Sequence, residues 1–342
     1  MKKSSFFIGS LTALTTVSLL FSGCSSKQYF EPEQTFSASN AANSYGGTIV
    51  DLSRDGATLK SGKYIGKAGL SNIDLGEGYR FLSESPSYVL AGNAEGVLKI
   101  IDKSTGEAVR AVALHVPIVS ASIKNGVIAY ILNNNTFGIY QVEDNRKVLE
   151  SRSERTFAID TRAASPMFID HLAVMPMLDG KLIIVNAKNT EDAKVVYLSS
   201  EKVFNNVVYL SRMGNTMVAA TPKKLITLGN DGKKEYRANI SEATVSGGHV
   251  YLFTKEGEVI ELDKTLQPLA HKKFKYAHFS ASTAFDGKVY ALDQQGSLIV
   301  LSSDLSKYKI YDLGEVDNPV FITGSKLYKD GRIIELSKLG YE

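Results

Sequence analysis

The chain has 342 residues, enough for one large all-β domain or two smaller domains once a leader is removed. Its formal net charge is only +3, so the composition gives no electrostatic case for nucleic-acid binding. A single cysteine excludes an internal disulfide, and tryptophan is absent, so tyrosine and phenylalanine provide the aromatic bulk.

Residues 1–23 have the layout of a secretory signal peptide. Lys2 and Lys3 supply the positive start, and an uncharged, mostly apolar stretch follows from Phe6 to Phe21. This stretch is too short to be a comfortable transmembrane span. We therefore expect export from the cytoplasm and removal of the leader.

The leader ends in Leu20-Phe21-Ser22-Gly23-Cys24, which resembles the lipobox of bacterial lipoproteins, with Phe21 where leucine is usual. The resemblance implies cleavage between Gly23 and Cys24 and attachment of lipid, such as palmitate, to Cys24. Several acyl chains on one cysteine give stable anchoring. Serine rather than aspartate after the cysteine resembles the outer-membrane class of lipoproteins, which face the periplasm.

Residues 24–46 are polar and poor in large apolar side chains, and this composition predicts a flexible lipidated tether. Fully extended at ~3.3 Å per residue, such a tether could reach roughly 75 Å. The folded domain is expected over residues 47–342, well clear of the membrane.

The rest of the chain repeats with a period of roughly 40 residues. Each unit holds two apolar runs around a turn that usually ends in glycine or asparagine, which is a hairpin signal. We use the last turn residue as a marker, and the markers are Gly96, Asn135, Gly180, Lys223, Gly257, Gly296 and Gly331. The second residue after each marker is apolar, as Leu98, Phe137, Leu182, Leu225, Val259, Leu298 and Ile333. The fifth is also apolar, as Ile101, Tyr140, Val185, Leu228, Leu262, Leu301 and Leu336.

A unit of this length holds four short strands, and long amphipathic helical patterns are missing, so the repeat predicts an all-β fold, a β-propeller of four-stranded blades. Seven markers favour seven blades. An eighth marker at Gly56 fails the test, because Thr58 and Ser61 occupy the two apolar positions, although eight blades remain possible. The last unit lacks an outermost strand, so we expect an N-terminal strand, from residues 47–52 or 63–66, to close the ring.

The repeat resembles that of the PQQ-like propeller family. Gly287-Lys-Val-Tyr-Ala291 matches the first half of the family pattern, and Gly96-Val-Leu-Lys-Ile-Ile-Asp102-Lys-Ser-Thr-Gly106 matches the second. Together with the leader and lipobox, the chain resembles the BamB family, the usually eight-bladed propeller lipoproteins of the outer-membrane barrel-assembly machinery. The resemblance implies a scaffold that binds an envelope protein and contributes no chemistry. Quinone-dependent dehydrogenases share only the repeat, because their cofactor is held against tryptophan, which this chain lacks.

The sequence offers little for catalysis or metal binding. The five histidines form no metal-spaced pair, and no nucleophile elbow or phosphate loop occurs. Asp102, Asp263 and Asp293 lie at turn or strand-end positions of the repeat, which indicates a structural role in accepting hydrogen bonds from turn amides. Asp160, Asp170 and Asp179 break the repeat and are therefore the candidates for a catalytic carboxylate.

His271-Lys-Lys-Phe-Lys-Tyr276 is the densest basic stretch. Strand alternation places Lys272 on the opposite face from Lys273, so the lysines are divided between two faces, which favours a solvated strand over a docking site for an acidic partner or headgroup.

These observations predict a membrane-anchored periplasmic propeller lipoprotein that acts as a protein-binding scaffold in outer-membrane protein assembly. No enzyme activity, cofactor, metal site or nucleic-acid partner is expected. Two alternatives stay open: an accessory subunit of another periplasmic complex, such as a respiratory enzyme, and a propeller hydrolase.

Overall fold

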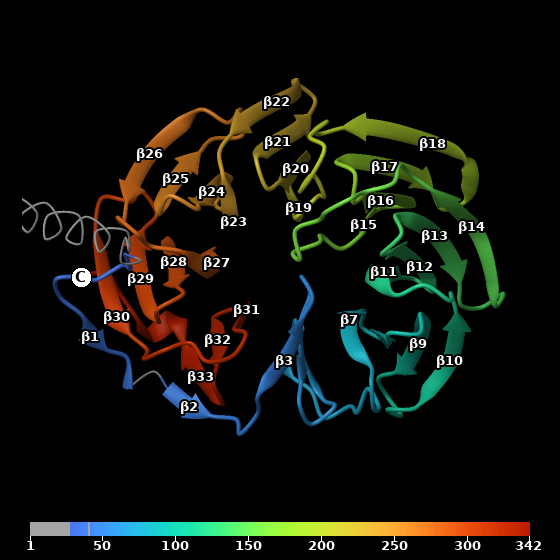
Figure 1. The fold of residues 1–342 in the computed structure, drawn as a ribbon, viewed down its shortest axis with the longest axis horizontal. Coiled ribbons are helices and arrows are strands. Elements are labelled where there is room, and N and C mark those ends of the chain that lie inside the picture. Colours follow the sequence, from blue (N-terminus) through green and yellow to red (C-terminus); the bar gives the residue numbers. More distant parts are fainter. Residues whose placement is uncertain (1–27, 40–41) are drawn as a thin grey trace, which may run out of the picture.

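The computed structural model describes residues 28–39 and 42–342. Within these residues the strands form eight sheets, which stand around a central axis as the blades of a propeller (Figure 1). The one described helix is a short 3-10 turn, Leu336–Lys338. The predicted all-β propeller of four-stranded blades is therefore confirmed.

Each blade runs from an innermost to an outermost strand. Blade 1 consists of β3 (Ile49–Leu52), β4 (Ala57–Leu59), β5 (Tyr64–Gly66) and β6 (Gly69–Leu70). Blade 2 consists of β7 (Arg80–Glu84), β8 (Tyr88–Gly92), β9 (Val97–Asp102) and β10 (Ala108–Ala113). Blade 3 consists of β11 (Ile118–Lys124), β12 (Val127–Leu132), β13 (Thr136–Gln141) and β14 (Arg146–Arg152). Blade 4 consists of β15 (Met167–Ile169), β16 (Leu172–Pro176), β17 (Lys181–Asn186) and β18 (Asn189–Tyr197).

The second half continues this order. Blade 5 consists of β19 (Tyr209–Met213), β20 (Thr216–Thr221), β21 (Lys224–Gly229) and β22 (Gly232–Arg237). Blade 6 consists of β23 (Ile240–Ser246), β24 (His249–Thr254), β25 (Glu258–Leu262) and β26 (Pro268–Lys273). Blade 7 consists of β27 (Phe279–Phe285), β28 (Lys288–Asp293), β29 (Ser297–Ser302) and β30 (Tyr308–Asp312), and β1 (Phe36–Ser37) adds a parallel fifth strand. Blade 8 consists of β31 (Phe321–Thr323), β32 (Lys326–Lys329), β33 (Arg332–Glu335) and β2 (Ala42–Ser44).

The core lies between neighbouring blades. The middle strands are covered on both faces and therefore read as continuous apolar runs, as in β29, where every residue is buried. The outer strands face water and are mostly exposed, as in β10. Stacked sheets thus bury the faces that a single blade would leave in water.

A repeated hydrogen bond joins each blade to the connection that leads to the next blade. The backbone carbonyl of each marker, which we call the marker carbonyl, accepts a bond from a backbone N–H just after the outermost strand. The donor and acceptor pairs are Leu114–Gly96, Ser153–Asn135, Leu198–Gly180, Ala238–Lys223, Phe274–Gly257, Leu313–Gly296 and Tyr45–Gly331, at 2.8 to 3.3 Å. The marker turn is thus the joint of the propeller.

The propeller has eight blades rather than the seven that the sequence favoured, and the eighth marker is Gly62. Its carbonyl accepts a bond of 2.9 Å from the N–H of Leu75, as at the other markers. Gly56, where the sequence test was applied, lies instead in the turn before β4. The strands of blade 1 are so short that the fifth position after Gly62 falls on Lys67, outside β5, and the pattern fails there.

An N-terminal strand closes the ring, as predicted, but it comes from a different segment. Residues 47–52 and 63–66 contribute to blade 1, and β2 takes the outermost position of blade 8, antiparallel to β33. The bond from Tyr45 to the Gly331 marker carbonyl shows that β2 occupies the place of a regular fourth strand. The predicted boundary at residue 46 is therefore wrong, because β1, the buried Ala38 and β2 belong to the propeller.

The recurring aspartates have the structural role predicted for them. The Asp102 and Asp263 carboxylates each accept a 2.7 Å bond from the backbone N–H two residues later, and Asp293 accepts bonds from the N–H groups of His278 and Gln295. The predicted cleavage and lipid site at Gly23 and Cys24 lies outside the described residues. No helix within the described ranges is long and apolar enough to cross a membrane.

Candidate functional site

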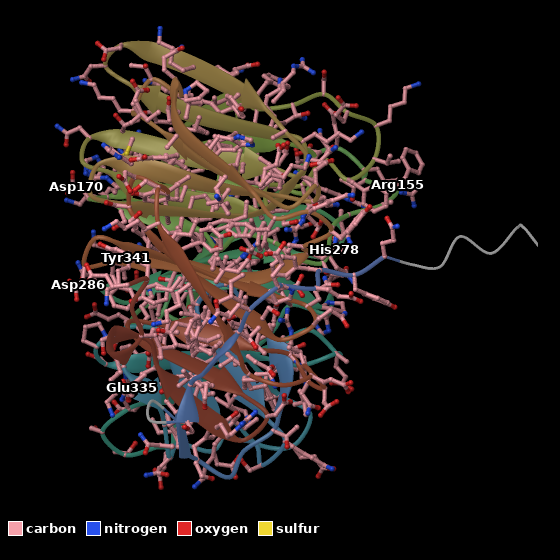
Figure 2. All side chains as sticks on the ribbon, turned by 90° about the vertical axis from the view of Figure 1, so that its left-hand side faces the viewer. Arg155, Asp170, His278, Asp286, Glu335 and Tyr341 are labelled. Carbon is pink, nitrogen blue, oxygen red and sulfur yellow. The ribbon has the colours of Figure 1, made fainter. Side chains whose placement is uncertain are left out.

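Two long connections on either side of blade 4 form the candidate site. Residues 153–166 lead from β14 to β15, and residues 198–208 lead from β18 to β19. We call these two segments the blade 4 loops. The first of them carries Arg155, which lies on the same side of the disc as His278 (Figure 2).

Hydrogen bonds join the two loops to each other. The N–H of Phe204 donates to the carbonyl of Ala158, and the N–H of Ala164 donates to that of Val207, both at 2.9 Å. The Asn206 amide accepts from the N–H of Asp160 at 2.7 Å and donates to the carbonyl of the same residue at 3.0 Å. These bonds therefore tie the two irregular loops to each other at several points along their length.

Asp179 anchors both loops to blade 4. One of its carboxylate oxygens accepts from the Ser153 hydroxyl at 2.6 Å and from the N–H of Glu154 at 3.1 Å. The same oxygen lies 3.1 Å from the Lys181 ammonium, and the Asp179 carbonyl accepts from the Asn205 amide at 2.9 Å. This carboxylate is buried, so the bonds hold the loops in one arrangement.

This fixed base presents apolar side chains to water. Phe157 is 86% exposed, and Val203 and Phe204 of the facing loop are 46% and 49% exposed. Arg155 and Lys202, also exposed, flank them. Exposed aromatic residues on a rigid base are typical of protein-docking sites, because such residues lose little conformational freedom on binding.

The first loop also reaches the propeller axis through a chain of ion pairs. The Arg162 guanidinium donates to the Asp160 carboxylate, with 2.7 Å between Nε and Oδ1, and lies 3.9 Å from Glu242 of β23. The other oxygen of Glu242 lies 2.9 Å from Arg54, which follows β3 of blade 1. Burial raises the pKa of the Asp160 carboxyl, but the hydrogen bonds and charge of Arg162 outweigh burial and hold this pKa below its ordinary value.

Arg54, Arg162 and Glu242 line a central cavity of about 1310 Å³. Figure 1 shows the chain that follows β3 reaching into the middle of the ring. Its turn is closed by a bond of 2.9 Å from the N–H of Ser53 to the carbonyl of Gly56, and Arg54 extends from this turn to blade 6. The ion pair therefore links two blades that are not neighbours across the axis.

The structure brings together two of the three carboxylates that break the repeat. Asp160 and Asp179 both support the blade 4 loops. Asp170 lies in the turn between β15 and β16, on the opposite side of the disc (Figure 2). Within residues 28–39 and 42–342, no group of three or more histidine, cysteine or acidic side chains is arranged to hold a metal ion.

Sequence reasoning missed the exposed side chains Phe157, Val203 and Phe204. A usable signal was present in the marker spacing, because the two longest intervals, Asn135–Gly180 and Gly180–Lys223, contain the blade 4 loops. Extra residues in a repeat indicate loops, and long loops often carry function.

Comparison with known proteins supports the fold and adds distant relatives. No protein-family model matches the chain. Plasminogen-binding protein PgbB from Helicobacter pylori strains J99 and 26695 is 26% identical over an alignment of 359 positions, which covers 91% of this chain. The chain spans 66% of the length of these curated relatives.

Among solved structures, BamB from Moraxella catarrhalis superposes with a TM-score of 0.66 at 15% identity, covering 85% of this chain and 98% of BamB. The chain has the propeller fold of BamB. The C-terminal WD40 domain of Sif2 gives a TM-score of 0.63 at 12% identity, with 86% and 98% coverage. The designed protein Ika8 gives 0.62 at 12% identity, with 85% and 96% coverage. At these identities the likeness concerns the fold alone.

Proposed function

We propose that the protein is a lipid-anchored platform of the bacterial cell envelope, which binds a protein partner through the blade 4 loops. Lipid on Cys24 would hold it at the outer membrane, facing the periplasm. The observation that carries the proposal is the exposed apolar cluster of Phe157, Val203 and Phe204 on a hydrogen-bonded base. A platform needs such a preformed surface, because ordering a loop on binding costs affinity.

The surroundings of the carboxylates favour binding over hydrolysis. Asp160 is paired with Arg162, and its lowered pKa makes it a poor general base near neutral pH. Asp179 is bonded to backbone and side-chain donors of the loop that it anchors. If the protein is a platform, Asp170→Asn should leave a deletion strain rescued, whereas Asp160→Asn and Asp179→Asn should lose rescue only in proportion to lost partner binding, because both carboxylates support the blade 4 loops. Loss of rescue by a folded, normally abundant variant that still binds its partner would favour the hydrolase alternative.

Two partners merit direct tests. The BamB fold supports a partner in outer-membrane barrel assembly, in which case barrel proteins should fall in the deletion strain. Normal barrel levels would favour an accessory role in another periplasmic complex. The similarity to PgbB over 91% of the chain makes plasminogen the second candidate, which is tested by binding of plasminogen to the purified protein.

The decisive experiment compares substitutions at the platform with one elsewhere. Phe157→Ala and Phe204→Ala together should weaken partner binding by about 2 kcal/mol or more, as expected for two aromatic anchors. Val109→Ser removes an exposed apolar side chain from the outer strand of blade 2 and should leave binding unchanged. If the unaltered protein, the double phenylalanine variant and Val109→Ser all bind the partner equally and unfold at the same midpoint, the docking surface lies elsewhere.

A further inference from the structure

The N-terminal segment does not stand away from the propeller but lies along the outer edge of blade 7. Phe30 packs edge-to-face on Phe274, with 6.0 Å between ring centroids, at the end of blade 6. β1 then pairs with β30, and the buried Ala38 joins the core between blades 7 and 8. The described chain begins at Gln28, and its first residues lie on the side of the disc that carries His278 (Figure 2).

This placement shortens the distance between the propeller and a lipid anchor. Gln28 follows Cys24 by four residues, which span at most about 13 Å when fully extended. If Cys24 carries lipid, as the proposed function requires, the edge formed by blades 6 and 7 cannot leave the neighbourhood of the headgroups. The roughly 75 Å of freedom expected from a tether over residues 24–46 is not available.

The side chains along this edge suit a headgroup layer. Tyr308 of β30 is 43% exposed and lies beneath the ammonium of Lys272, 4.6 Å from its ring centre. Phe36 of β1 is likewise exposed, and the ammonium of Lys309 lies 4.3 Å from its ring centre. Aromatic rings beside lysines are the side chains that favour the membrane interface, since the rings enter the apolar boundary and the ammonium groups meet phosphates.

Charge at this edge is mixed. Lys275 and Lys307 are exposed and add to the lysines over the rings, whereas Lys273 is paired with Glu258 at 3.3 Å and the Lys309 ammonium donates to the carbonyl of Glu342 at 2.7 Å. Exposed carboxylates offset the lysines, namely Glu31, Glu33, Asp304 and Asp312. The contact would therefore rest mainly on aromatic burial, and the ammonium groups of Lys272 and Lys275 would meet anionic headgroups.

We propose that the blade 6–7 edge lies on the membrane as a second contact beside the lipid on Cys24, so that the disc stands on edge. The blade 4 loops are carried by the other side of the ring from blade 7 (Figure 1). The docking platform is then held away from the lipid surface, open to a partner that extends from the membrane. The proposal assigns the basic stretch 271–276 to headgroups, the alternative that the sequence did not favour.

Because the chain contains no tryptophan, an introduced tryptophan can be followed by its fluorescence without a contribution from other tryptophans in the protein. The full-length protein is purified with its lipid, which mass spectrometry verifies, and is reconstituted into vesicles that contain bromine-labelled phosphatidylglycerol as quencher. Tyr308→Trp places a reporter on the edge, and Tyr197→Trp places a matched one on the outer strand of blade 4. Tryptophan at 308 should be strongly quenched, and tryptophan at 197 should give the emission measured in unlabelled vesicles.

Charge reversal provides the second arm. Lys272→Glu with Lys275→Glu should reduce quenching of the 308 reporter to the level found in vesicles whose bromine-labelled lipid is uncharged. Lys194→Glu with Lys234→Glu, on blades 4 and 5, should leave the quenching unchanged. No quenching at 308, or equal quenching at 308 and 197, would overturn the edge-on arrangement. A protein purified without lipid would instead contradict the anchoring in the proposed function. In that case the same reporters, with the protein added to vesicles, test the edge alone.

Discussion

Replacement of Gly296 by alanine tests the joint between blades 7 and 8. Gly296 has φ +93, and an added Cβ would lie 1.9 Å from the carbonyl oxygen of Gly314, in the connection to blade 8. Gly287, in the preceding hairpin turn of the same blade, has φ +69, and its Cβ would meet no atom within 4 Å. Both substitutions force alanine into the left-handed region, which costs roughly 1–2 kcal/mol.

Only Gly296→Ala also forces two backbone segments apart. Steric overpacking typically costs 1–3 kcal/mol, so Gly296→Ala should lower the free energy of unfolding by about 2–5 kcal/mol, against about 1–2 for Gly287→Ala. The movement would also stretch the 3.0 Å bond from Leu313 to the marker carbonyl. Urea unfolding measures the difference, as a lower midpoint with an unchanged slope. Losses that agree within about 0.5 kcal/mol would refute the joint as a close backbone contact.

Three further predictions concern closure and the axis. Deleting residues 28–44 should lower the urea midpoint, because β33 becomes an open edge; a midpoint equal to that of the intact protein would contradict closure by β2. The folded-state pKa of Asp160 is lowered, so its contribution to stability should be complete above its ordinary value of 3.8 and lost as pH falls below that value toward the folded pKa. Asp160→Asn should remove this part of the pH dependence, and urea midpoints between pH 3 and 7 check it. A double-mutant cycle of Arg54→Gln and Glu242→Gln should give a coupling of about 1–2 kcal/mol, since both side chains are largely buried; no coupling would mean that the pair adds nothing across the axis.

The repeat could be recognised in the sequence because the marker position has two structural roles. At every marker except Lys223 the residue turns the hairpin with positive φ, and each marker carbonyl accepts the bond from the next connection, as at Gly96 and Gly257. Apolar residues at fixed offsets follow, since the middle strands are buried on both faces. These requirements act within one blade, so a single sequence displays them, and seven of the eight blades could be identified.

Blade 1 and the closing strand could not be recognised in the sequence, because they lack apolar residues at the fixed offsets. The two middle strands of blade 1 have three residues each, too few to place an apolar residue at the fifth position after Gly62. β2 reads Ala-Asn-Ser and has no apolar alternation. Its position is set by backbone bonds to β33 and by Tyr45 at the Gly331 joint, which hydropathy does not record.

The candidate site was partly visible. Asp160 and Asp179 were singled out because they break the repeat, and they do lie together at the blade 4 loops. Their role as loop anchors depends on Asn206 and Ser153, which reach them from distant or irregular backbone that no periodicity describes. The exposure of Phe157 could not be predicted, because an apolar residue in a loop is as compatible with the core as with a docking surface.

Photo-crosslinking in intact cells tests the central claim most directly. A photoreactive amino acid is placed at Phe157, at Phe204 and, as the control, at Asp170, which lies in an exposed turn on the opposite side of the disc (Figure 2). The account predicts that the reporters at 157 and 204 capture the same envelope protein and that the reporter at 170 does not. Capture from 170 alone, or no capture from 157 and 204 in cells where the protein is folded and abundant, would contradict a platform built on the blade 4 loops.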